Sequence, residues 1–483
     1  MLDNRLKLCA EMVNGSGIVC DVGTDHAYLA AELIKTDKCR RVIASDIKQG
    51  PLDAAAKTVE KSGVKEKVEL VLSDGLENIS LNGVSDVVIA GMGGETIADI
   101  IDRCVGLCNP DVQLVLQPMT KAEVLRKYLG EKGFAVDSEK IAVDGEKMYV
   151  VMAAHYSGVK RFVSEKESLT GLLQPDTDQS EAFIQRKAAK LKKIAEQLLS
   201  GEKEKEAAHY HSLAVQLTSG KTYYDRDEIY SCLNSVYPFS AQEKWDNSGM
   251  LAEGAEKVSR VLLTLDIDNK AVSEAVFCGA EMIISHHPVI FSPLKKICRN
   301  TPVWQLIRGD ITAICMHTNV DRSSEGTNGV ILRKISERYE LSGEPEFLED
   351  CGDGTGIGYI CELKEETGSV QFGEFLREIF GCNTVRVNSC RSETIKRIAF
   401  CSGSGGSMLG EAVSRDCDAY ITGDVKHDVW IDANNSGITL YDCGHFHTEN
   451  PVLEEFRYVL ERNFPLLDVI IAGSSADPVD YIR

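Results

Sequence analysis

Two adjacent histidines, His286 and His287, stand between two apolar runs and are followed at once by Pro288. The preceding Ile283 and Ile284 have the character of a buried strand end. Because a proline disfavours helix at the residue before it, the chain is expected to bend here, and both imidazoles can then face one crevice. Consecutive α-carbons lie about 3.8 Å apart, close to the roughly 3.5–4 Å between the ions of a two-metal site. A surface turn with two ordinary histidines is the alternative that the pair alone leaves open.

Two later strand ends offer further metal-ligand types. An expected strand at 311–316 leads to Asp321, and one at 438–442 leads to His445 and Glu449, which lie four apart and share a helical face. If these strands and the one before the histidine pair are parallel neighbours, all the groups meet at one carboxyl edge. Three imidazoles and two carboxylates suit two divalent first-row ions such as Zn, Fe, Mn, Co or Ni, with Asp321 or Glu449 as the bridge. The predicted ligands are His286, His287, Asp321, His445 and Glu449. Three further residues could line the site or be structural: His317, Asp246 and His427.

The first 160 residues alternate short apolar runs with helical patterns. Helices are expected at 27–36 and 51–62, and the last two strands flank a turn at Asp144-Gly145. This alternation indicates a doubly wound α/β sheet, and the final strand pair indicates a hairpin at its edge. The expected strands span 17–23, 41–46, 67–72, 87–90, 114–116, 134–142 and 147–154.

Polar residues follow the first three of these strands, where ligands of a doubly wound sheet bind. Gly23 permits a tight turn, Asp46 can accept both hydroxyls of a ribose, and Asp74 stands where an adenine edge would lie. NAD is the rival ligand, but Gly-x-Gly-x-x-Gly is absent and Asp25 stands where its second glycine should be. A carboxylate there would repel a pyrophosphate yet tolerate the cationic sulfonium of S-adenosylmethionine. The spacing therefore favours this methyl donor over a nucleotide or a structural turn.

Residues 162–215 are charged and have the pattern of helices. An apolar seam that buries against a partner helix is formed by Ile184, Ala188, Leu191, Ala195 and Leu198. Arg186, Lys190 and Lys193 share another face, with Lys187 and Lys192 beside it. In an acidic chain this run is the best local footprint for RNA, with a solvated helix face as the alternative.

Bulk properties set further limits. A chain of 483 residues is too long for one ordinary core, so two or three domains are expected. A net charge of −21 argues against generic nucleic-acid binding, and no DNA partner is expected. The N-terminus lacks a signal peptide and no stretch approaches a membrane span, so a cytoplasmic protein without membrane contact is expected. The 16 scattered cysteines then read as reduced thiols.

Six stretches of the first half carry a family resemblance. They are Leu-x-x-Arg-Leu at the start, Asp-Val-Gly-Thr-Asp-His-Ala-Tyr-Leu from Asp21, Ala-Ser-Asp at 44–46, Ser-Asp-Gly-Leu at 73–76, Ala-Gly-Met-Gly-Gly at 90–94 and Leu-Gln-Pro at 116–118. Residues 1 to about 220 resemble the bacterial tRNA adenine-N1 methyltransferases that act on adenine 22. The resemblance implies a class I methyltransferase fold and a C-terminal coiled-coil appendage that helps grip tRNA. It implies donor contacts from Asp21, Gly23, Asp46, Asp74 and Gly91. The family usually has glycine where Ala27 stands, a departure expected to affect donor binding little.

This reaction needs mainly positioning, because adenine N1 already carries a lone pair and the base must be flipped out. The catalytic candidates that hold the base are Asp25, His26 and Gln117. His26 could equally cap the following helix. The RNA-binding candidates are Arg5, Arg186, Lys187, Lys190 and Lys193.

The second half carries its own set of motifs. They are Trp-Asp-Asn-Ser-Gly from Trp245, Ser-His-His-Pro at 285–288, His-Thr-Asn-Val-Asp at 317–321, Ile-Thr-Gly-Asp-Val-Lys-His at 421–427 and Gly-His-Phe-His-Thr-Glu at 444–449. This half resembles the NIF-three-like family of dinuclear-metal proteins, often labelled GTP cyclohydrolase type-two homologues. The resemblance implies two related α/β lobes, a ring-shaped homo-hexamer and metals facing its cavity, held by the five ligands named above.

The sequence thus predicts an α/β fusion. A class I methyltransferase domain with a Rossmann-like seven-stranded sheet spans 1–160, a helical coiled-coil appendage and linker 161–220, and a two-lobed dinuclear-metal domain 221–483. The cofactors expected are S-adenosylmethionine and two divalent ions, and the partners are tRNA and copies of the chain itself. Two questions stay open: whether the first domain is catalytic or only binds RNA, and whether the second is a metal-dependent hydrolase or a non-catalytic scaffold.

Overall fold

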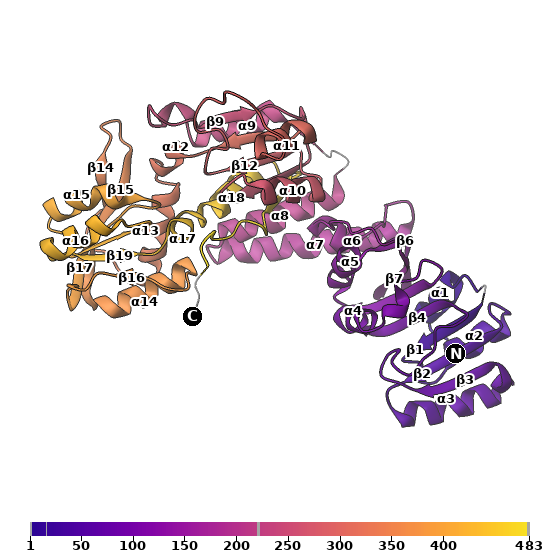
Figure 1. Cartoon of the computed structure of the whole chain (residues 1–483). Coiled ribbons are helices and arrows are strands. Elements are labelled where there is room, and N and C mark those ends of the chain that lie inside the picture. The colour runs from indigo at the N-terminus through magenta and orange to yellow at the C-terminus, as the bar shows by residue number, and fades with distance from the viewer. Residues whose placement is uncertain (1, 16, 220–222, 481–483) are drawn as a thin grey trace. The chain divides into compact units, whose positions relative to one another are not determined.

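A computed structural model describes residues 2–15, 17–219 and 223–480 (Figure 1). The chain forms two compact units. Unit 1 comprises Met1–Gln197 and Leu213–Gly220, and unit 2 comprises Leu198–Ser212 and Lys221–Arg483. The predicted helical segment at 161–220 therefore contributes to both units, and the domain limits at 160 and 220 stay a prediction.

Unit 1 is built on one seven-stranded sheet, as predicted. Its strand order is β3-β2-β1-β4-β5-β7-β6, in which the first five strands pair in parallel. Strand β7 pairs antiparallel with both β5 and β6, which forms the predicted edge hairpin. The strands are β1 (Ile18–Val22), β2 (Arg41–Asp46), β3 (Val68–Leu72), β4 (Val84–Gly93), β5 (Gln113–Thr120), β6 (Phe134–Asp144) and β7 (Lys147–Tyr156).

Helices cover both faces of this sheet, so its central strands are apolar on both sides. On β4, Val87 and Ile89 belong to one core with Ile97, whereas Val88 between them belongs to the other core with Leu29. Because both faces are covered, the carboxyl edge of the sheet is left as the place for a ligand. The helices are α1 (Asn4–Met12), α2 (Tyr28–Lys35), α3 (Gln49–Lys61), α4 (Gly94–Asp102), α5 (Ala122–Lys132) and α6 (Glu165–Thr170).

Two long helices follow, α7 (Asp178–Ser200) and α8 (Glu204–Thr218). The predicted seam on α7 is buried at Ile184, Ala188, Leu191 and Ala195 and half-buried at Leu198. The spacing of four and three thus predicted the packed face of α7 correctly.

Unit 2 contains two larger sheets. The five-stranded sheet has the order β20-β11-β12-β13-β9, and the six-stranded sheet has the order β14-β15-β17-β18-β19-β16. The strands of the first are β9 (Gly249–Ala252), β11 (Arg260–Thr264), β12 (Met282–Ser285), β13 (Thr312–Cys315) and β20 (Asp468–Ile471). Those of the second are β14 (Glu346–Asp350), β15 (Gly356–Gly368), β16 (Arg386–Val387), β17 (Thr394–Phe400), β18 (Ala419–Thr422) and β19 (Thr439–Asp442). A separate pair joins β8 (Tyr224–Asp225) to β10 (Lys257–Val258).

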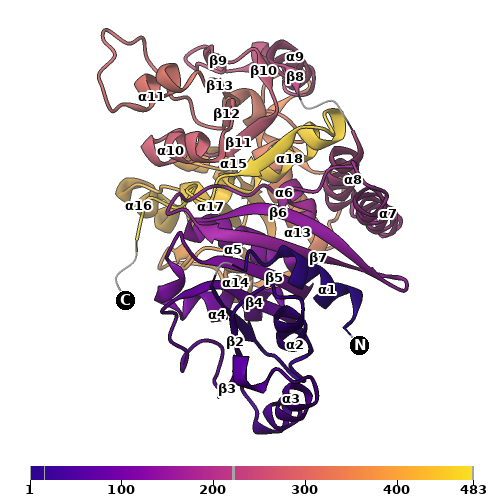
Figure 2. The same ribbon diagram turned by 90° about the vertical axis from the view of Figure 1, so that its right-hand side faces the viewer.

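The helices of unit 2 connect and cover these sheets. They are α9 (Arg226–Val236), α10 (Asn269–Cys278), α11 (Pro302–Gly309), α12 (Thr318–Asp321), α13 (Thr327–Arg338), α14 (Ser369–Phe380), α15 (Leu409–Ser414), α16 (His427–Ser436), α17 (His445–Glu449) and α18 (Val452–Asn463). Figure 2 shows α17 leading into α18, after which β20 pairs with β11. The end of the chain therefore returns to the first sheet. Within the described residues, no helix combines the length and the apolar character needed to cross a membrane.

The expectation that the three ligand-bearing strands are neighbours in one sheet is wrong. Strands β12 and β13 are parallel neighbours, but β19 belongs to the six-stranded sheet. The chain leaves the first sheet after β13 and builds the second before it reaches α17. The candidate metal site therefore lies between two sheets, and spacing along the chain could not distinguish this arrangement from a single shared edge.

Candidate functional site

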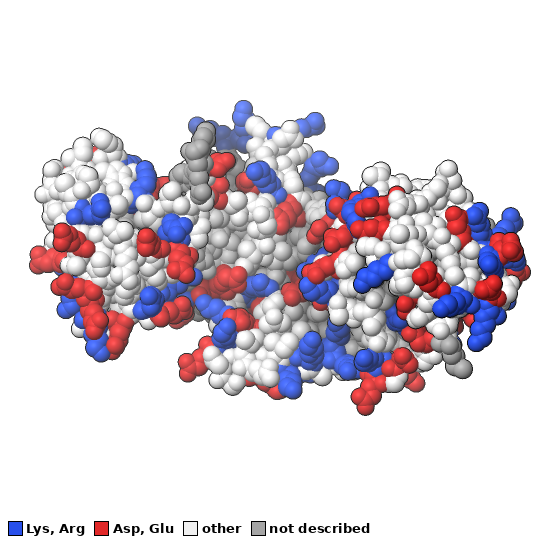
Figure 3. All heavy atoms as spheres, turned by 90° about the horizontal axis from the view of Figure 1, so that it is seen from below, with Lys and Arg blue, Asp and Glu red and all other residues white. Residues whose placement is uncertain are grey.

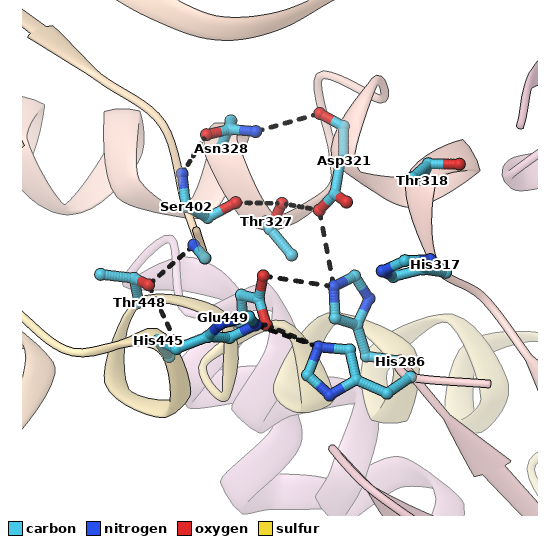
Figure 4. Close-up of polar contacts among 12 residues, drawn as sticks. His286, His317, Thr318, Asp321, Thr327, Asn328, Ser402, His445, Thr448 and Glu449 are labelled. Atoms are coloured by element: carbon cyan, nitrogen blue, oxygen red, sulfur yellow. Dashed lines mark hydrogen bonds and ion pairs between the residues drawn. The ribbon is translucent and has the colours of Figure 1, made fainter. Parts of the chain in front are cut away.

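The five predicted metal ligands converge, although they come from two sheets. His286 and His287 follow β12, Asp321 ends α12 after β13, and His445 and Glu449 begin and end α17 after β19. Figure 4 shows the labelled members of this cluster turned toward one another. The bend expected at the histidine pair therefore does bring both imidazoles to one site.

The cluster divides into two trios that share Glu449. In the first, His286 Nε2 lies 3.5 Å from Asp321 Oδ1 and 3.8 Å from Glu449 Oε1. In the second, Glu449 Oε2 lies 3.0 Å from both His287 Nε2 and His445 Nε2, and these two nitrogens are 3.3 Å apart. The possible ligand atoms of each trio lie within 4.8 Å of one another. Of the two predicted bridges, Glu449 has the matching geometry, because each of its oxygens faces a different trio.

The second nitrogen of each imidazole is held by an acceptor. His287 Nδ1 lies 2.8 Å from Asp266, and His445 Nδ1 lies 2.9 Å from Asp424. In both pairs the aspartate precedes the histidine by 21 residues, because each belongs to a repeated strand–helix–strand segment, β11-α10-β12 and β18-α16-β19. These contacts direct Nε2 of both rings toward Glu449, as outer acceptors do for metal-bound histidines.

His286 has a different support and provides a test of metal fit. Its Nδ1 lies 2.8 Å from the Met316 carbonyl, and its ring is fully buried. Its Nε2 has no hydrogen-bond partner among the described residues. A buried unpaired ring nitrogen beside Asp321, which Thr327 orients by donating a 2.6 Å hydrogen bond, fits a cation ligand. The residues present therefore suit the two predicted ions.

The pKa shifts of the second trio also fit a bound cation. Burial opposes protonation of His287, but hydrogen bonds to Asp266 and Glu449 outweigh it and raise its pKa to about 10. Burial likewise opposes protonation of His445, yet Glu449 and Asp424 raise its pKa to about 9. The pocket thus attracts positive charge strongly, and a bound cation would displace protons from these rings.

His317 lies beside the first trio, whereas His427 does not belong to the cluster. The His317 ligand nitrogen lies within 4.8 Å of those of His286 and His287. Its Nδ1 lies 2.7 Å from Asp246, whose carboxylate also accepts from the Thr318 amide at 3.1 Å. Burial opposes ionisation of Asp246, but hydrogen bonds from His317 and from the Thr318 hydroxyl outweigh it and lower the pKa of Asp246. His317 is therefore fixed with Nε2 toward the cluster, while His427 is exposed at the start of α16.

The second trio opens onto a cavity of about 470 Å³. Both His287 and His445 line it, together with the outer carboxylates Asp266 and Asp424. A small molecule can therefore reach His287 and His445 of the second trio, whereas His286 is buried.

In unit 1, three of the five expected donor-binding residues, Asp21, Gly23 and Asp46, lie where β1 and β2 end. Gly23 has φ +73°, and its amide donates to the Ser45 carbonyl at 2.9 Å, which brings the turn against the end of β2. Asp46 accepts from the Lys48 amide at 3.0 Å and from the Asp25 amide at 3.4 Å. A carboxylate offers about four acceptor positions, so Asp46 keeps capacity for ribose hydroxyls.

Asp21 and Ala27 contribute to the conformation of this turn. Asp21 is buried below it and accepts a 2.6 Å hydrogen bond from Thr24, and burial raises the pKa of Asp21 to about 6. Ala27 has φ +53°, a left-handed conformation that glycine adopts without steric cost. A glycine would meet this backbone requirement more readily than Ala27 does, and the small effect of Ala27 on donor binding stays a prediction.

The other predicted residues of unit 1 occupy distinct places. Gln117 is buried, and its Oε1 accepts from Arg5 Nη1 at 2.7 Å and from the Gly91 amide at 3.1 Å. Gln117 and Arg5 therefore fix the irregular stretch of β4 at Gly91. Asp74 faces Arg103, which donates to both of its oxygens at 3.1 and 3.2 Å.

Asp25 and His26 lie at the exposed rim of the donor turn, with His26 Nε2 3.7 Å from the Asp25 carboxylate. Among the described residues His26 does not cap α2 through its side chain, because the residue at the cap position is Ala27, which makes no such bond. Both side chains are thus available to a substrate from solvent.

A basic cleft of about 620 Å³ begins one residue after Gln117. The end of β5, the start of α5, β7 and α7 form its walls. Its cations are Lys121, Lys147, Arg186, Lys187 and Lys190, and its one carboxylate is Glu123. Burial lowers the pKa of Lys187. Three of the predicted RNA-binding residues line this cleft, but Lys193 and Arg5 do not.

Several supporting residues were missed at the sequence level. Asp266 and Asp424 hold two of the proposed ligands, and Lys121 and Lys147 add to the basic cleft. The equal spacing of 21 residues between each aspartate and its histidine was the available signal for the first pair. No signal in the sequence marked Lys121 and Lys147 as part of the cleft, because only the fold brings them close to α7.

Known proteins resemble this chain separately over the two regions that carry these sites. A sequence profile of the Duf34/NIF3 (NGG1p interacting factor 3) family matches residues 224–478, more than half of the chain. The chain belongs to this family. A Duf34/NIF3 relative from Campylobacter jejuni, described as a GTP cyclohydrolase 1 type 2 homolog, is 32% identical over 259 residues, covering 53% of this chain and 98% of its own. The NIF3 homolog of Schizosaccharomyces pombe is 30% identical over 271 residues, covering 52% and 96%.

The N-terminal part of this Duf34/NIF3 protein matches a different family. Residues 2–152 match a methyltransferase domain, so the predicted fusion of a methyltransferase with a NIF3-type domain is confirmed. A solved Streptococcus pneumoniae structure, named “putative tRNA (m1A22) methyltransferase”, is 30% identical and covers 45% of this chain and all of its own, with a TM-score of 0.42.

Proposed function

We propose that unit 1 methylates N1 of an adenine in tRNA, adenine 22 by the resemblance of its motifs, with S-adenosylmethionine as donor. The observation that carries the proposal is the proximity of a donor turn and a basic cleft along one sheet edge. The turn holds Gly23 and Asp46, and the cleft begins at Pro118, next to the Gln117 that fixes Gly91.

Each of these residues has a separate expected role. Asp46 accepts the ribose hydroxyls of the donor, and the Gly23 turn brings backbone amides close to it. Gln117 accepts from the Gly91 amide and so holds this part of β4 in place. When bound, the donor supplies an electrophilic methyl group. Adenine N1 already has a lone pair, so the protein needs to position the base rather than remove a proton. Asp25 and His26, exposed at the rim, are the candidates for contacting that base.

The cleft supplies local positive charge in an acidic chain. On the face shown in Figure 3, acidic and basic side chains are interspersed, without one continuous basic surface. Cations on α7, at Arg186, Lys187 and Lys190, are therefore suited to a few phosphates of a shaped RNA rather than to nucleic acid in general.

The test is a methylation assay with tRNA transcripts, followed by mapping of the modified base by mass spectrometry. The expected product is 1-methyladenosine at one position, and Asp46→Asn should abolish it. Donor binding without methyl transfer would instead support the rival, a non-catalytic RNA-binding module.

The RNA contact has its own matched control on α7. Lys190→Glu, inside the cleft, should weaken tRNA binding and reduce the salt slope of log K by about 0.9. Lys192→Glu makes the same charge change on the same helix outside the cleft lining, and should have a smaller effect. Equal effects would contradict the cleft as the RNA site.

For unit 2 we infer a metal-dependent hydrolase of a nucleotide or a related ring compound. The supporting observation is the division of the ligands into two trios bridged by Glu449, one of which opens onto a cavity. Two divalent ions held there would supply Lewis acidity toward a substrate. His287 and His445 would hold an ion at the cavity wall, and His286 with Asp321 would hold one on the buried side.

Metal analysis of protein purified without chelators should find two ions per chain. Hydrolysis of GTP or other phosphorylated compounds, lost in His286→Ala, would support catalysis. The second candidate is a metal-containing scaffold, in which a homo-hexamer multiplies the methyltransferase. Two bound ions, no turnover and a loss of tRNA methylation on deleting 226–483 would favour that scaffold.

A further inference from the structure

Arg386 is the one arginine or lysine among the described residues that lines the cavity of the second trio. Four carboxylates line the same cavity: Asp266, Asp424, Asp442 and Asp477. Three of them face an imidazole, and the fourth, Asp442, faces Arg386. The side chain of Arg386 is nevertheless 58% exposed. An exposed guanidinium in a cavity that a small molecule can enter is suited to bind an anionic group.

The guanidinium of Arg386 is held in place from two sides. Arg386 pairs in register with Asp442 across β16 and β19, and its Nη2 donates to the buried carboxylate of that residue. Its central carbon lies over the ring of Trp430, 5.6 Å from the ring centre. Because both contacts hold this flexible side chain before a ligand arrives, binding would cost little further ordering.

The contact with Asp442 does not use up the binding capacity of Arg386. The Asp442 carboxylate also accepts from the Val425 amide at 3.0 Å and from the Gly444 amide at 2.9 Å. Within the part of the chain that the structure describes, Nη2 is the one guanidinium nitrogen of Arg386 with a hydrogen-bond partner. A guanidinium has five N–H donors, so donors remain for the oxygens of an anion. The exposed Thr384 lines the same cavity, and its hydroxyl offers a further donor.

The strand that holds Arg386 also leads to a metal ligand. β19 ends at Asp442, and His445 follows three residues later at the start of α17. Because His287, His445 and Arg386 line one cavity of about 470 Å³, a molecule of ordinary ligand size can contact all three at once. Its charged group would lie at Arg386, which leaves a different part of the molecule to face the ions.

We propose that Arg386, assisted by the Thr384 hydroxyl, is the oxyanion subsite of unit 2. It binds a phosphate or carboxylate group that does not itself react, and so positions another bond of the same molecule against the side of the cavity formed by His287 and His445. This inference rests on the hydrolase proposed above and adds the residue that orients its substrate. The alternative is a structural Arg386 that only neutralises Asp442, in which case an anion would bind to the ions alone.

Isothermal titration calorimetry of the full, metal-loaded chain tests the subsite with two probes, inorganic phosphate and acetate, which separate the two oxyanion types. Arg386→Met should weaken binding of the preferred probe about 10- to 150-fold, the range for lost hydrogen bonds to a charged group. Arg391→Met removes the same charge five residues later and outside the cavity lining, and should leave the affinity unchanged. Elemental analysis of each variant measures whether both ions are retained.

Arg386→Lys covers the case in which Arg386→Met fails to fold or loses an ion, because Arg386→Met leaves the buried Asp442 without its cation. The lysine keeps the charge beside Asp442 but lacks the planar fork of donors, so it should also weaken binding of the probe. In that case an unchanged affinity in Arg386→Lys would overturn the subsite.

The remaining outcomes separate the subsite from the hydrolase. No binding of either probe to the unsubstituted chain, an unchanged affinity in Arg386→Met at full metal content, or an equal loss in Arg391→Met would each overturn the subsite. Weaker binding in Arg386→Met without turnover of any compound would keep the subsite and refute hydrolysis. If a compound is turned over, Arg386→Met should raise KM more than it lowers kcat, and an unchanged KM would overturn the subsite.

Discussion

The two trios that share Glu449 should lose their ions separately, because their outer supports differ. In the second trio, His287 and His445 are each backed by a carboxylate side chain, Asp266 and Asp424. In the first, the outer partner of His286 is a backbone carbonyl, which no side-chain substitution removes. Replacing Asp266 and Asp424 by asparagine therefore perturbs one ion and spares the other.

The magnitude follows from these contacts. Loss of an outer partner of a metal-bound histidine typically lowers metal affinity by about 10- to 100-fold. Asp266 and Asp424 touch different imidazoles of the same trio, so the double variant should lose roughly 10²- to 10⁴-fold if the two effects add. Titration with a graded chelator, read by elemental analysis, should reveal one ion leaving much earlier than in the unsubstituted chain and the other leaving at an unchanged chelator concentration.

Asp477→Asn provides the matched control. Asp477 lines the same cavity, but its carboxylate lies 3.2 Å from His447 Nε2, and His447 is not a proposed ligand. This variant should retain both ions. If both ions leave together in the double variant, or if the affinity falls by less than threefold, the division into two unequal trios is refuted.

Three further predictions, each tested by thermal unfolding, concern the structure of unit 1. Asp21→Asn should stabilise the fold by roughly 1–3 kcal/mol at pH 8. The reason is that burial gives the Asp21 carboxyl a folded-state pKa of about 6, above its unfolded value, so its charge is unfavourable above pH 6. The gain in stability should shrink as the pH falls toward 4, where the carboxyl is protonated in both states. Gly91→Ala should destabilise by about 1–3 kcal/mol, because φ is +83° there, whereas Gly50→Ala, in open space on α3, should stabilise by about 0.5–1 kcal/mol. Arg126→Met should cost about 3–5 kcal/mol, because it leaves the buried Glu139 carboxylate without its cation, and adding Glu139→Leu should recover part of the loss.

Opposite results would be informative in each case. Destabilisation by Asp21→Asn at pH 8 would mean that the ionised carboxylate is needed by the fold. Equal effects of the two glycine substitutions would remove the argument from left-handed backbone. No recovery in the double variant at 126 and 139 would mean that packing, rather than charge, dominates there.

Local periodicity predicted most of unit 1. The expected strand at 41–46 coincides with β2, and the hairpin turn at Asp144-Gly145 lies between β6 and β7, because apolar runs and turn residues act over a few positions. The place of β7 between β5 and β6 could not be read in this way, since it depends on pairing between distant strands. The seam of α7 was predictable for the same reason as β2: its period is local.

The metal cluster was predictable in composition but not in architecture. Residue type alone identified the five groups that converge, because few other roles combine imidazoles and carboxylates at strand ends. The sheet that carries His445 and Glu449, the choice of Glu449 over Asp321 as the bridge and the position of His317 all depend on how two sheets meet. In unit 1, likewise, the sequence could not reveal that Gln117 is engaged by Arg5 and Gly91.

The return of β20 to β11 sets the timing of folding during synthesis. Arg260 on β11 meets Asp468 on β20, 208 residues later. At about 5–20 residues per second, a ribosome leaves that edge of β11 without its neighbour for roughly 10–40 s. An unpaired strand edge can join another chain during this time. The sheet of unit 1 needs no strand beyond Tyr156, so it can close first, while the first sheet of unit 2 waits for nearly the whole length of that unit.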